Sequence, residues 1–169
     1  MMSTAIPETR QYLTFKLRDE VFALDVSKVR EVLDLTTITK IPRTPDFMSG
    51  VINLRGNVVP VVDLRQCLDM STTEKTANAC IVVVEVVLDG ESTTIGALAD
   101  SVLEVIELDS ERIQPTPRIG MHLRTDFIYG MGKRDEQIIM ILDIDRVFSV
   151  DDMGALRKET TLGRDEAVA

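Results

Sequence analysis

Tryptophan is absent from this sequence, and aromatic residues make up only 4% of its 169 positions. Proteins that bind single-stranded nucleic acid stack the bases on aromatic side chains, and proteins that bind duplexes display clustered basic residues. Here acidic residues outnumber basic ones by 28 to 19, which gives a formal net charge of −9. The composition therefore argues against a nucleic-acid binder and against binding to anionic membranes. A core with so few aromatics must be built from Val, Ile, Leu and Met, and β-branched side chains favour strands.

Residues that commonly carry catalysis are scarce too. His122 is the single histidine, so neither a histidine-paired triad nor a histidine-rich zinc site can be built. Cys67 and Cys80 lack C-x-x-C spacing, which predicts buried free thiols in a reducing compartment. The segment Gly130–Lys133 resembles a fragment of a phosphate loop but lacks the rest of either nucleotide motif. We therefore predict a protein that is not an enzyme and that uses no cofactor and no metal ion.

Long hydrophobic runs are missing as well. The longest, Ala79–Val84, is far shorter than the roughly 20 residues that a transmembrane helix needs. The N-terminus has no apolar segment of the kind found in signal peptides. We therefore expect a cytoplasmic protein.

The chain divides by composition into three parts. We expect a flexible N-terminus over residues 1–11, a single domain over 12–150, and a helical or disordered tail over 151–169. A polar stretch at 71–78 predicts a boundary inside the domain, between a first β subdomain at about 12–75 and a second at about 76–150.

A repeat supports this division. The segment Val29–Leu35 aligns with Val102–Leu108 at an offset of 73 (102 − 29), and Val58–Leu64 aligns with Ile138–Ile144 at an offset of 80 (138 − 58). Each copy has alternating apolar residues that predict about five short strands. One such unit is too small to bury a good core alone, so we predict that two copies pack together.

The stretch from Gly50 to Arg65 predicts a hairpin. Strands at Val51–Leu54 and Val58–Val62 would meet at Arg55-Gly56-Asn57, where glycine tolerates a positive φ. Pro60 cannot donate to a ladder, so its strand should lie at an edge or carry a bulge. Asp63 should then cap a short helix, and its counterpart Asp143 should do the same.

The tip of this hairpin differs between the two copies. Asn53-Leu54-Arg55-Gly56 in the first copy stands where Lys133-Arg134-Asp135-Glu136 stands in the second. Because a charged turn suffices in the second copy, we interpret the first tip as a contact surface. Arg55 is then either a solvated turn residue or a binding hot spot worth roughly 2 kcal/mol. Val29 and Val32 suit a core position and a shallow apolar groove equally well.

The run Gly50–Arg65 resembles the signature of the CheW family of chemotaxis coupling proteins, and the similarity extends from about Tyr12 through Phe148. The resemblance implies a mainly all-β fold, with two five-stranded SH3-like β-barrels on a shared core, short helices and a C-terminal helix. It also implies a non-catalytic adaptor that couples methyl-accepting chemoreceptors to the regulatory domain of the histidine kinase CheA, in the cytoplasm at membrane-associated receptor arrays.

Site residues follow from the same resemblance. The receptor-binding residues that it implies are Val29, Glu31, Gly50, Asn53, Leu54, Arg55 and Gly56. For the kinase it suggests the second-copy hairpin, with Gly130, Met131, Lys133, Arg134 and Asp135. Two alternatives stay open: a coupler in a twitching or surface-sensing pathway, and a small β-barrel enzyme or nucleic-acid binder.

Overall fold

The computed structural model describes residues 9–68, 70, 77–116 and 127–148. Three features expected from the sequence lie outside these residues: His122, most of the flexible N-terminus and the C-terminal tail with its helix. The first strand begins at Thr9, so it includes the last three residues of the expected N-terminal segment.

Strands dominate the described residues, as the sequence predicts. The strands are β1 (Thr9–Leu17), β2 (Glu20–Asp25), β3 (Val29–Asp34), β4 (Met48–Leu54), β5 (Asn57–Asp63), β6 (Cys80–Leu88), β7 (Glu91–Ala99), β8 (Ser101–Asp109), β9 (Ile113–Gln114), β10 (Ile128–Arg134) and β11 (Gln137–Leu142). The helices are short: η2 (Val26–Lys28), α1 (Leu64–Cys67), η3 (Ser110–Arg112) and α2 (Ile144–Val147).

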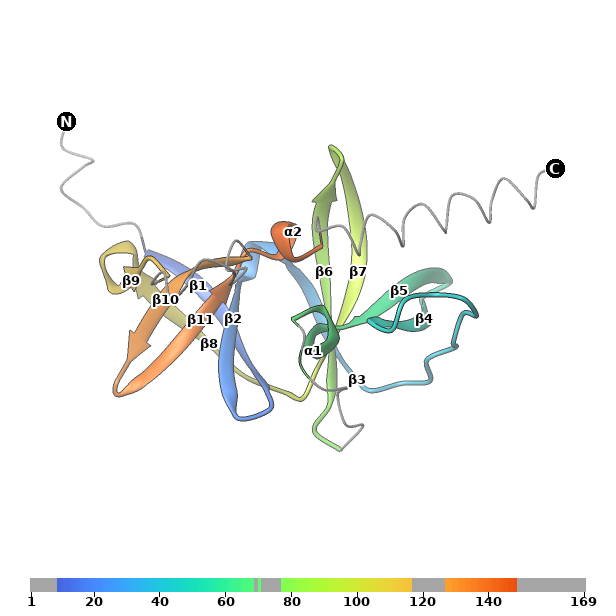
Figure 1. Cartoon of the computed structure of the whole chain (residues 1–169), viewed down its shortest axis with the longest axis horizontal. Coiled ribbons are helices and arrows are strands. Elements are labelled where there is room, and N and C mark those ends of the chain that lie inside the picture. Colours follow the sequence, from blue (N-terminus) through green and yellow to red (C-terminus); the bar gives the residue numbers. More distant parts are fainter. Residues whose placement is uncertain (1–8, 69, 71–76, 117–126, 149–169) are drawn as a thin grey trace.

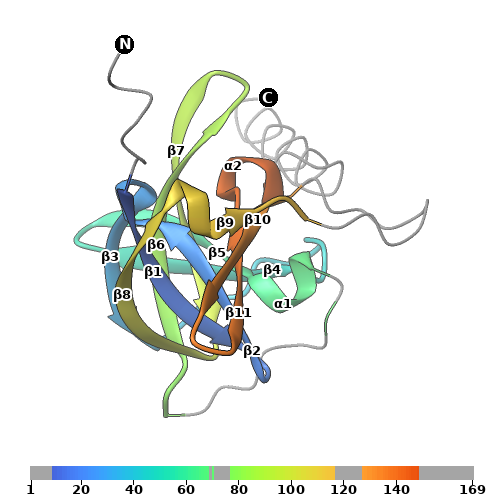
Figure 2. The same cartoon turned by 90° about the vertical axis from the view of Figure 1, so that its left-hand side faces the viewer.

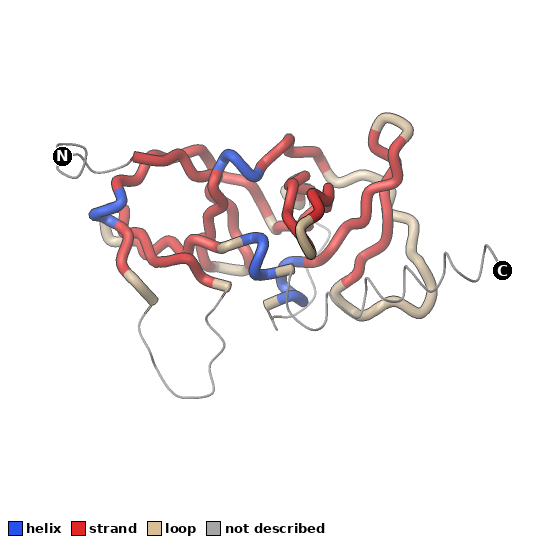
Figure 3. Tube along the Cα trace, turned by 90° about the horizontal axis from the view of Figure 1, so that it is seen from above, coloured by secondary structure: helices blue, strands red, loops and turns tan. Residues whose placement is uncertain are grey.

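Two curled sheets lie side by side along the longest axis of the molecule (Figure 1). The β4–β5 sheet has five strands in the order β3-β6-β7-β5-β4. The β10–β11 sheet has six, in the order β8-β1-β2-β11-β10-β9, and its sixth strand, β9, is only two residues long. Seen from above, the second sheet curls round into a ring (Figure 3), and Figure 2 shows it end-on. The predicted fold class, two small barrel-like units with short helices, is confirmed.

Each sheet combines strands from both halves of the chain. The hairpin β1–β2 belongs to the β10–β11 sheet, whereas β6–β7 belongs to the β4–β5 sheet. The observed division therefore differs from the expected subdomains at about 12–75 and 76–150, because the two copies exchange their first hairpins.

The short connectors explain this exchange. If the first copy closed on itself, β3 would pair with β1 and run parallel to β2. The connector from the end of β2 to the start of β3 would then have to span the length of a strand, about 20 Å. The connector has only three residues, Val26–Lys28, which span at most about 10 Å. The chain therefore continues from β2 into the other sheet. In the second copy only Asp100 separates β7 from β8, so the same argument holds there.

One hydrophobic cluster joins the two sheets. It contains Phe15 and Leu24 from the β10–β11 sheet, Val84 and Ala97 from the β4–β5 sheet, and Phe148 after α2. All five side chains are almost completely buried. Burial of this much apolar surface between the sheets is the main force that holds them together.

Each sheet also encloses a smaller cluster of its own. Tyr12 and Ile139 belong to the cluster inside the β10–β11 sheet, and Ile81 and Leu98 to the one inside the β4–β5 sheet. The molecule is thus built from two small barrel-like interiors and a larger core between them, as expected for units too small to be stable alone.

The strand-end aspartates cap the short helices, as predicted. The Asp63 carboxylate accepts a hydrogen bond from the Arg65 backbone N–H at 3.0 Å, at the start of α1. The Asp143 carboxylate accepts one from the Arg146 backbone N–H at 3.3 Å, at the start of α2. Both aspartates therefore have a structural role.

Candidate functional site

The turn between β4 and β5 is a two-residue loop in the left-handed region. Arg55 has a φ of 50° and Gly56 one of 88°. Positive φ at both central residues matches the right-handed twist of a hairpin. The Asn53 side-chain oxygen accepts a hydrogen bond from the Gly56 backbone N–H at 2.8 Å, which fixes the turn. The geometry leaves the Arg55 side chain 69% exposed to solvent.

Arg55 forms a two-point ion pair with Glu31 of β3. One guanidinium nitrogen lies 3.3 Å from the first carboxylate oxygen, and the second nitrogen contacts the other oxygen. This side-chain hydrogen bonding lowers the pKa of Glu31 and raises the pKa of Arg55, so both groups are charged at neutral pH. Because β3 and β4 are the outer strands of their sheet, the pair also closes the sheet on itself.

We call Glu31, Asn53, Leu54, Arg55 and Gly56 the first tip. One exposed valine lies next to it: Val58 pairs with Asn53 in the ladder and is 74% exposed. Val32 follows Glu31 in β3 and is 41% exposed, and because successive side chains of a strand point to opposite faces, it lies on the face opposite the Glu31 carboxylate. Leu54 is half-buried against the interior of its sheet. The first tip therefore offers a fixed ion pair with apolar side chains beside it, a combination common in protein-binding surfaces.

Two residues expected in the receptor-binding set lie apart from the first tip. Val29 is half-buried against the core between the sheets, which favours its core interpretation. Gly50 is buried, with a φ of 146°, and a Cβ there would lie 2.2 Å from the carbonyl oxygen of Thr39. Gly50 lets the segment around Thr39 cross β4 closely, as the isolated bridge between Thr39 and Val51 records.

The second copy has an arginine–glutamate pair of the same kind at its own hairpin. Arg134 lies 3.3 Å from Glu104, which is equivalent to Glu31 at the offset of 73. Arg134 corresponds to Leu54 rather than to Arg55 at the offset of 80. The arginine of the second copy therefore stands one position earlier in the repeat than the arginine of the first copy. An arginine near the hairpin tip is therefore not peculiar to the first copy, because an arginine–glutamate pair lies at both hairpins.

We call Glu104, Lys133, Arg134 and Asp135 the second tip. All four are exposed. Ile138 (59% exposed) lies beside it, opposite Lys133 in the ladder, and Val105 (51% exposed) follows Glu104 in β8; they are equivalent to Val58 and Val32. Sequence reasoning gave Val32 a core position or a shallow apolar groove equally, and its 41% exposure favours the groove. It missed Val58, Val105 and Ile138, although the repeat offsets of 73 and 80 were a signal that could have found them.

The remaining residues proposed for the kinase lie away from the second tip. Gly130 is the counterpart of Gly50: it is buried, and a Cβ there would lie 2.6 Å from a methyl carbon of Ile113. Met131 is half-buried and pairs with Gln114 in the ladder. The same backbone crossing thus recurs in both copies, which gives both glycines a structural role.

Within the described ranges, no group of three His, Cys, Asp or Glu residues could hold a metal ion. A search of the same residues finds no helix that is long and apolar enough to cross a membrane.

Comparison with known proteins identifies relatives of this chain. The family model for the CheW-like domain matches residues 11–152. The chemotaxis protein CheW of Klebsiella aerogenes is 32% identical over 144 residues, covering 85% of this chain and 84% of that protein. A probable chemotaxis protein CheW of Rhizobium etli is 34% identical over 140 residues, covering 83% and 88%. The crystal structure of the scaffolding protein TtCheW from Thermoanaerobacter tengcongensis superposes with a TM-score of 0.74 at 34% identity, covering 87% of this chain and 96% of that one.

Proposed function

This chain belongs to the CheW family of chemotaxis proteins, and we propose that it couples the cytoplasmic tips of methyl-accepting chemoreceptors to the regulatory domain of the histidine kinase CheA. It does so as a scaffold that binds both partners and catalyses no reaction. Under this proposal it works in the cytoplasm, at membrane-associated receptor arrays.

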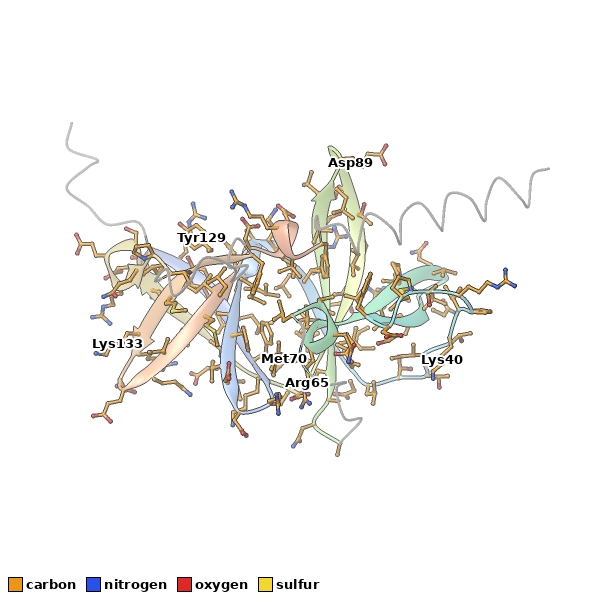
Figure 4. The ribbon with its side chains drawn as sticks, viewed as in Figure 1. Lys40, Arg65, Met70, Asp89, Tyr129 and Lys133 are labelled. Carbon is orange, nitrogen blue, oxygen red and sulfur yellow. The ribbon has the colours of Figure 1, made fainter. Side chains whose placement is uncertain are left out.

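The observation that carries the proposal is the duplication of one exposed surface on a single folded body. Each tip has an arginine–glutamate pair, with one exposed apolar residue, Val58 or Ile138, beside it in the ladder. The β4–β5 and β10–β11 hairpins lie toward opposite ends of the longest axis (Figure 1), and Figure 4 labels Lys133 of the second tip near one of these ends. A protein that must hold two partners at once needs two such faces far enough apart to avoid a clash.

We assign the receptor to the first tip and the kinase to the second. The first tip lies in the stretch that carries the family signature, and its Arg55–Glu31 pair holds the guanidinium in one orientation toward solvent. Arginine is enriched at binding hot spots because its planar fork makes several directed hydrogen bonds. Val58 supplies exposed apolar area beside it.

Individually weak interfaces suffice for this role. A contact of about 1,200 Å² or less is typical of transient signalling pairs. When the scaffold, receptors and kinase bind one another in an array, each further contact forms at a high effective concentration, so the assembly is far more stable than any one contact. The core shared between the two sheets lets one rigid body transmit a change at one tip to the other.

Replacing Arg55 with alanine tests the first tip. We expect the affinity for a receptor cytoplasmic fragment to fall about 30-fold, which corresponds to a hot spot of about 2 kcal/mol. Folding should be almost unaffected, because an ion pair this exposed to solvent contributes little to stability. Calorimetric titration gives the affinity, and thermal unfolding gives the stability.

Arg134→Ala is the matched control, since it removes the equivalent ion pair at the second tip. It should leave receptor affinity within about twofold and weaken binding to the kinase regulatory domain instead. Equal loss of both partners by both variants, or wild-type receptor affinity in Arg55→Ala, would contradict the assignment.

A further inference from the structure

Two ion pairs stand where the chain passes from one sheet to the other. Arg65 of α1 contacts Asp100, in the connector between β7 and β8, through two nitrogens, one of them at 3.0 Å. Lys28, at the end of the connector between β2 and β3, lies 2.9 Å from Asp145 of α2. The first pair is mostly buried and the second about one-third exposed. Figure 4 labels Arg65 near the middle of the molecule, between the sheets.

The two pairs are equivalent in the repeat but opposite in sign. Arg65 and Asp145 are the second residues of α1 and α2, and they correspond at the offset of 80. Lys28 corresponds to Ser101 at the offset of 73, next to Asp100. In the first pair the helix residue, Arg65, is positive and the connector residue, Asp100, is negative. In the second pair the helix residue, Asp145, is negative and the connector residue, Lys28, is positive.

Parallel strand pairing brings each pair together. Asp63 of β5 lies opposite Leu98 of β7. Two residues beyond this position on each strand, Arg65 reaches Asp100. In the same way β11 runs parallel to β2, and the residues that follow these strands include Asp145 and Lys28. Each ion pair therefore depends on which strand lies beside which.

Two further contacts link these carboxylates across the sheets. Asp100, which follows a strand of the β4–β5 sheet, accepts a hydrogen bond from the Arg18 backbone N–H in the β1–β2 turn. Asp145, which follows a strand of the β10–β11 sheet, accepts one from the Val87 backbone N–H at 2.9 Å. The ion pairs thus lie where the relative position of the two sheets is fixed.

A chain made of two similar units has a competing arrangement, in which β5 lies beside β2 and β11 beside β7. Connector length does not forbid the first of these contacts, because β2 and β5 are joined by the long segment 26–56. Both strands also precede β6 in the chain, so they are synthesised before β7 exists. In that arrangement Arg65 would meet Lys28, and Asp145 would meet Asp100. Both contacts would bring like charges together.

We propose that the reversed charges select the strand partners of β5 and β11, a choice that the short connectors leave open. Opposite charges stabilise the observed pairing, and like charges penalise pairing within one copy. Selection of this kind uses repulsion against the wrong partner as much as attraction to the right one.

Exchanging one pair tests the proposal. The variant Lys28→Asp with Asp145→Lys keeps opposite charges in the native arrangement but makes both competing contacts attractive, since position 28 now attracts Arg65 and position 145 attracts Asp100. We expect recovery of the native monomer after dilution from denaturant to be about tenfold slower, or the misassembled fraction to be about tenfold larger. Stopped-flow fluorescence of a bound dye and size-exclusion chromatography measure these quantities.

The matched control is Lys28→Ala with Asp145→Ala, which removes the same pair, and the same bond to Val87, without creating an attraction. It should refold at close to the wild-type rate. Adding Arg65→Asp and Asp100→Arg to the exchanged variant restores like charges in the competing contacts. Where this variant with four substitutions folds, it should refold at the wild-type rate. If the exchanged variant and the alanine control refold alike, the proposal is overturned.

Discussion

Replacing Gly50 with alanine is expected to destabilise the protein by about 3–5 kcal/mol, the sum of backbone strain at positive φ and overpacking against a neighbouring strand. The φ of 146° is one that side-chain-bearing residues rarely adopt, and the new Cβ would lie 2.2 Å from the Thr39 carbonyl oxygen. That oxygen also accepts the backbone hydrogen bond from Val51 at 2.8 Å, so it cannot move without loss of the bond. Chemical denaturation, with the midpoint and slope both fitted, gives the change in the free energy of unfolding.

Gly56→Ala is the control for this prediction. Its φ of 88° is also positive, but no atom lies within 4 Å of the added Cβ. We therefore expect only the conformational cost, about 1–2 kcal/mol. A loss for Gly50→Ala no larger than the loss for Gly56→Ala would show that the crossing at Thr39 is not close-packed.

Replacing Asp100 with alanine is expected to cost about 3 kcal/mol of stability, because it removes the carboxylate partner of a mostly buried guanidinium. The side chains of Arg65 and Asp100 are only 11% and 17% exposed, so solvent screens their interaction weakly. The same change removes the acceptor for the Arg18 backbone N–H. Thermal unfolding followed by far-UV circular dichroism measures the loss.

Asp145→Ala supplies the comparison at the equivalent ion pair. The side chains of Lys28 and Asp145 are 36% and 31% exposed, and pairs in contact with solvent contribute about 1 kcal/mol or less. The prediction is therefore a clear difference between two deletions, each of which removes the carboxylate of one of these ion pairs. Equal losses would mean that burial does not decide the contribution of these pairs.

Local features of the fold could be predicted from the sequence. Alternation of apolar residues, the Arg55-Gly56 turn and the capping positions of Asp63 and Asp143 all depend on neighbours in the chain, and the structure confirms them. The repeat offsets likewise predict two copies of one unit, because equivalent core positions repeat the same residue types.

The exchange of hairpins between the copies was not predicted, because two similar copies offer similar partners for every strand. A repeat shows which segments are equivalent, but it does not show which copy supplies the neighbour. The signal lay in connector length: Val26–Lys28 and Asp100 are too short for a return within one sheet.

Pro60 shows a second limit of sequence reasoning. A proline in a strand predicts an edge position or a bulge, yet β5 lies between β7 and β4. The ladder from β5 to β7 begins at Val61, one residue after the proline. Pro60 therefore lies where β5 has only β4 beside it, a local edge within an interior strand.

The candidate site could be predicted only in part. Glu31 and Arg55 lie 24 positions apart in the sequence, and their ion pair depends on the curling of the sheet. The recurrence of the pair at Glu104 and Arg134 was hidden by the shift of one residue. The offset of 80 relates Val58 to Ile138, but the exposure of both side chains is known only from the structure.

The central claim is that one body holds two partners at once, and a bridging assay tests it most directly. A receptor cytoplasmic fragment is immobilised, the CheA regulatory domain is supplied in solution, and the kinase domain captured is measured with and without this protein. We predict capture only when the protein is present, and its loss with either Arg55→Ala or Arg134→Ala, each variant still binding the other partner alone. Capture that does not need this protein, or competition between the two partners for it, would contradict the account.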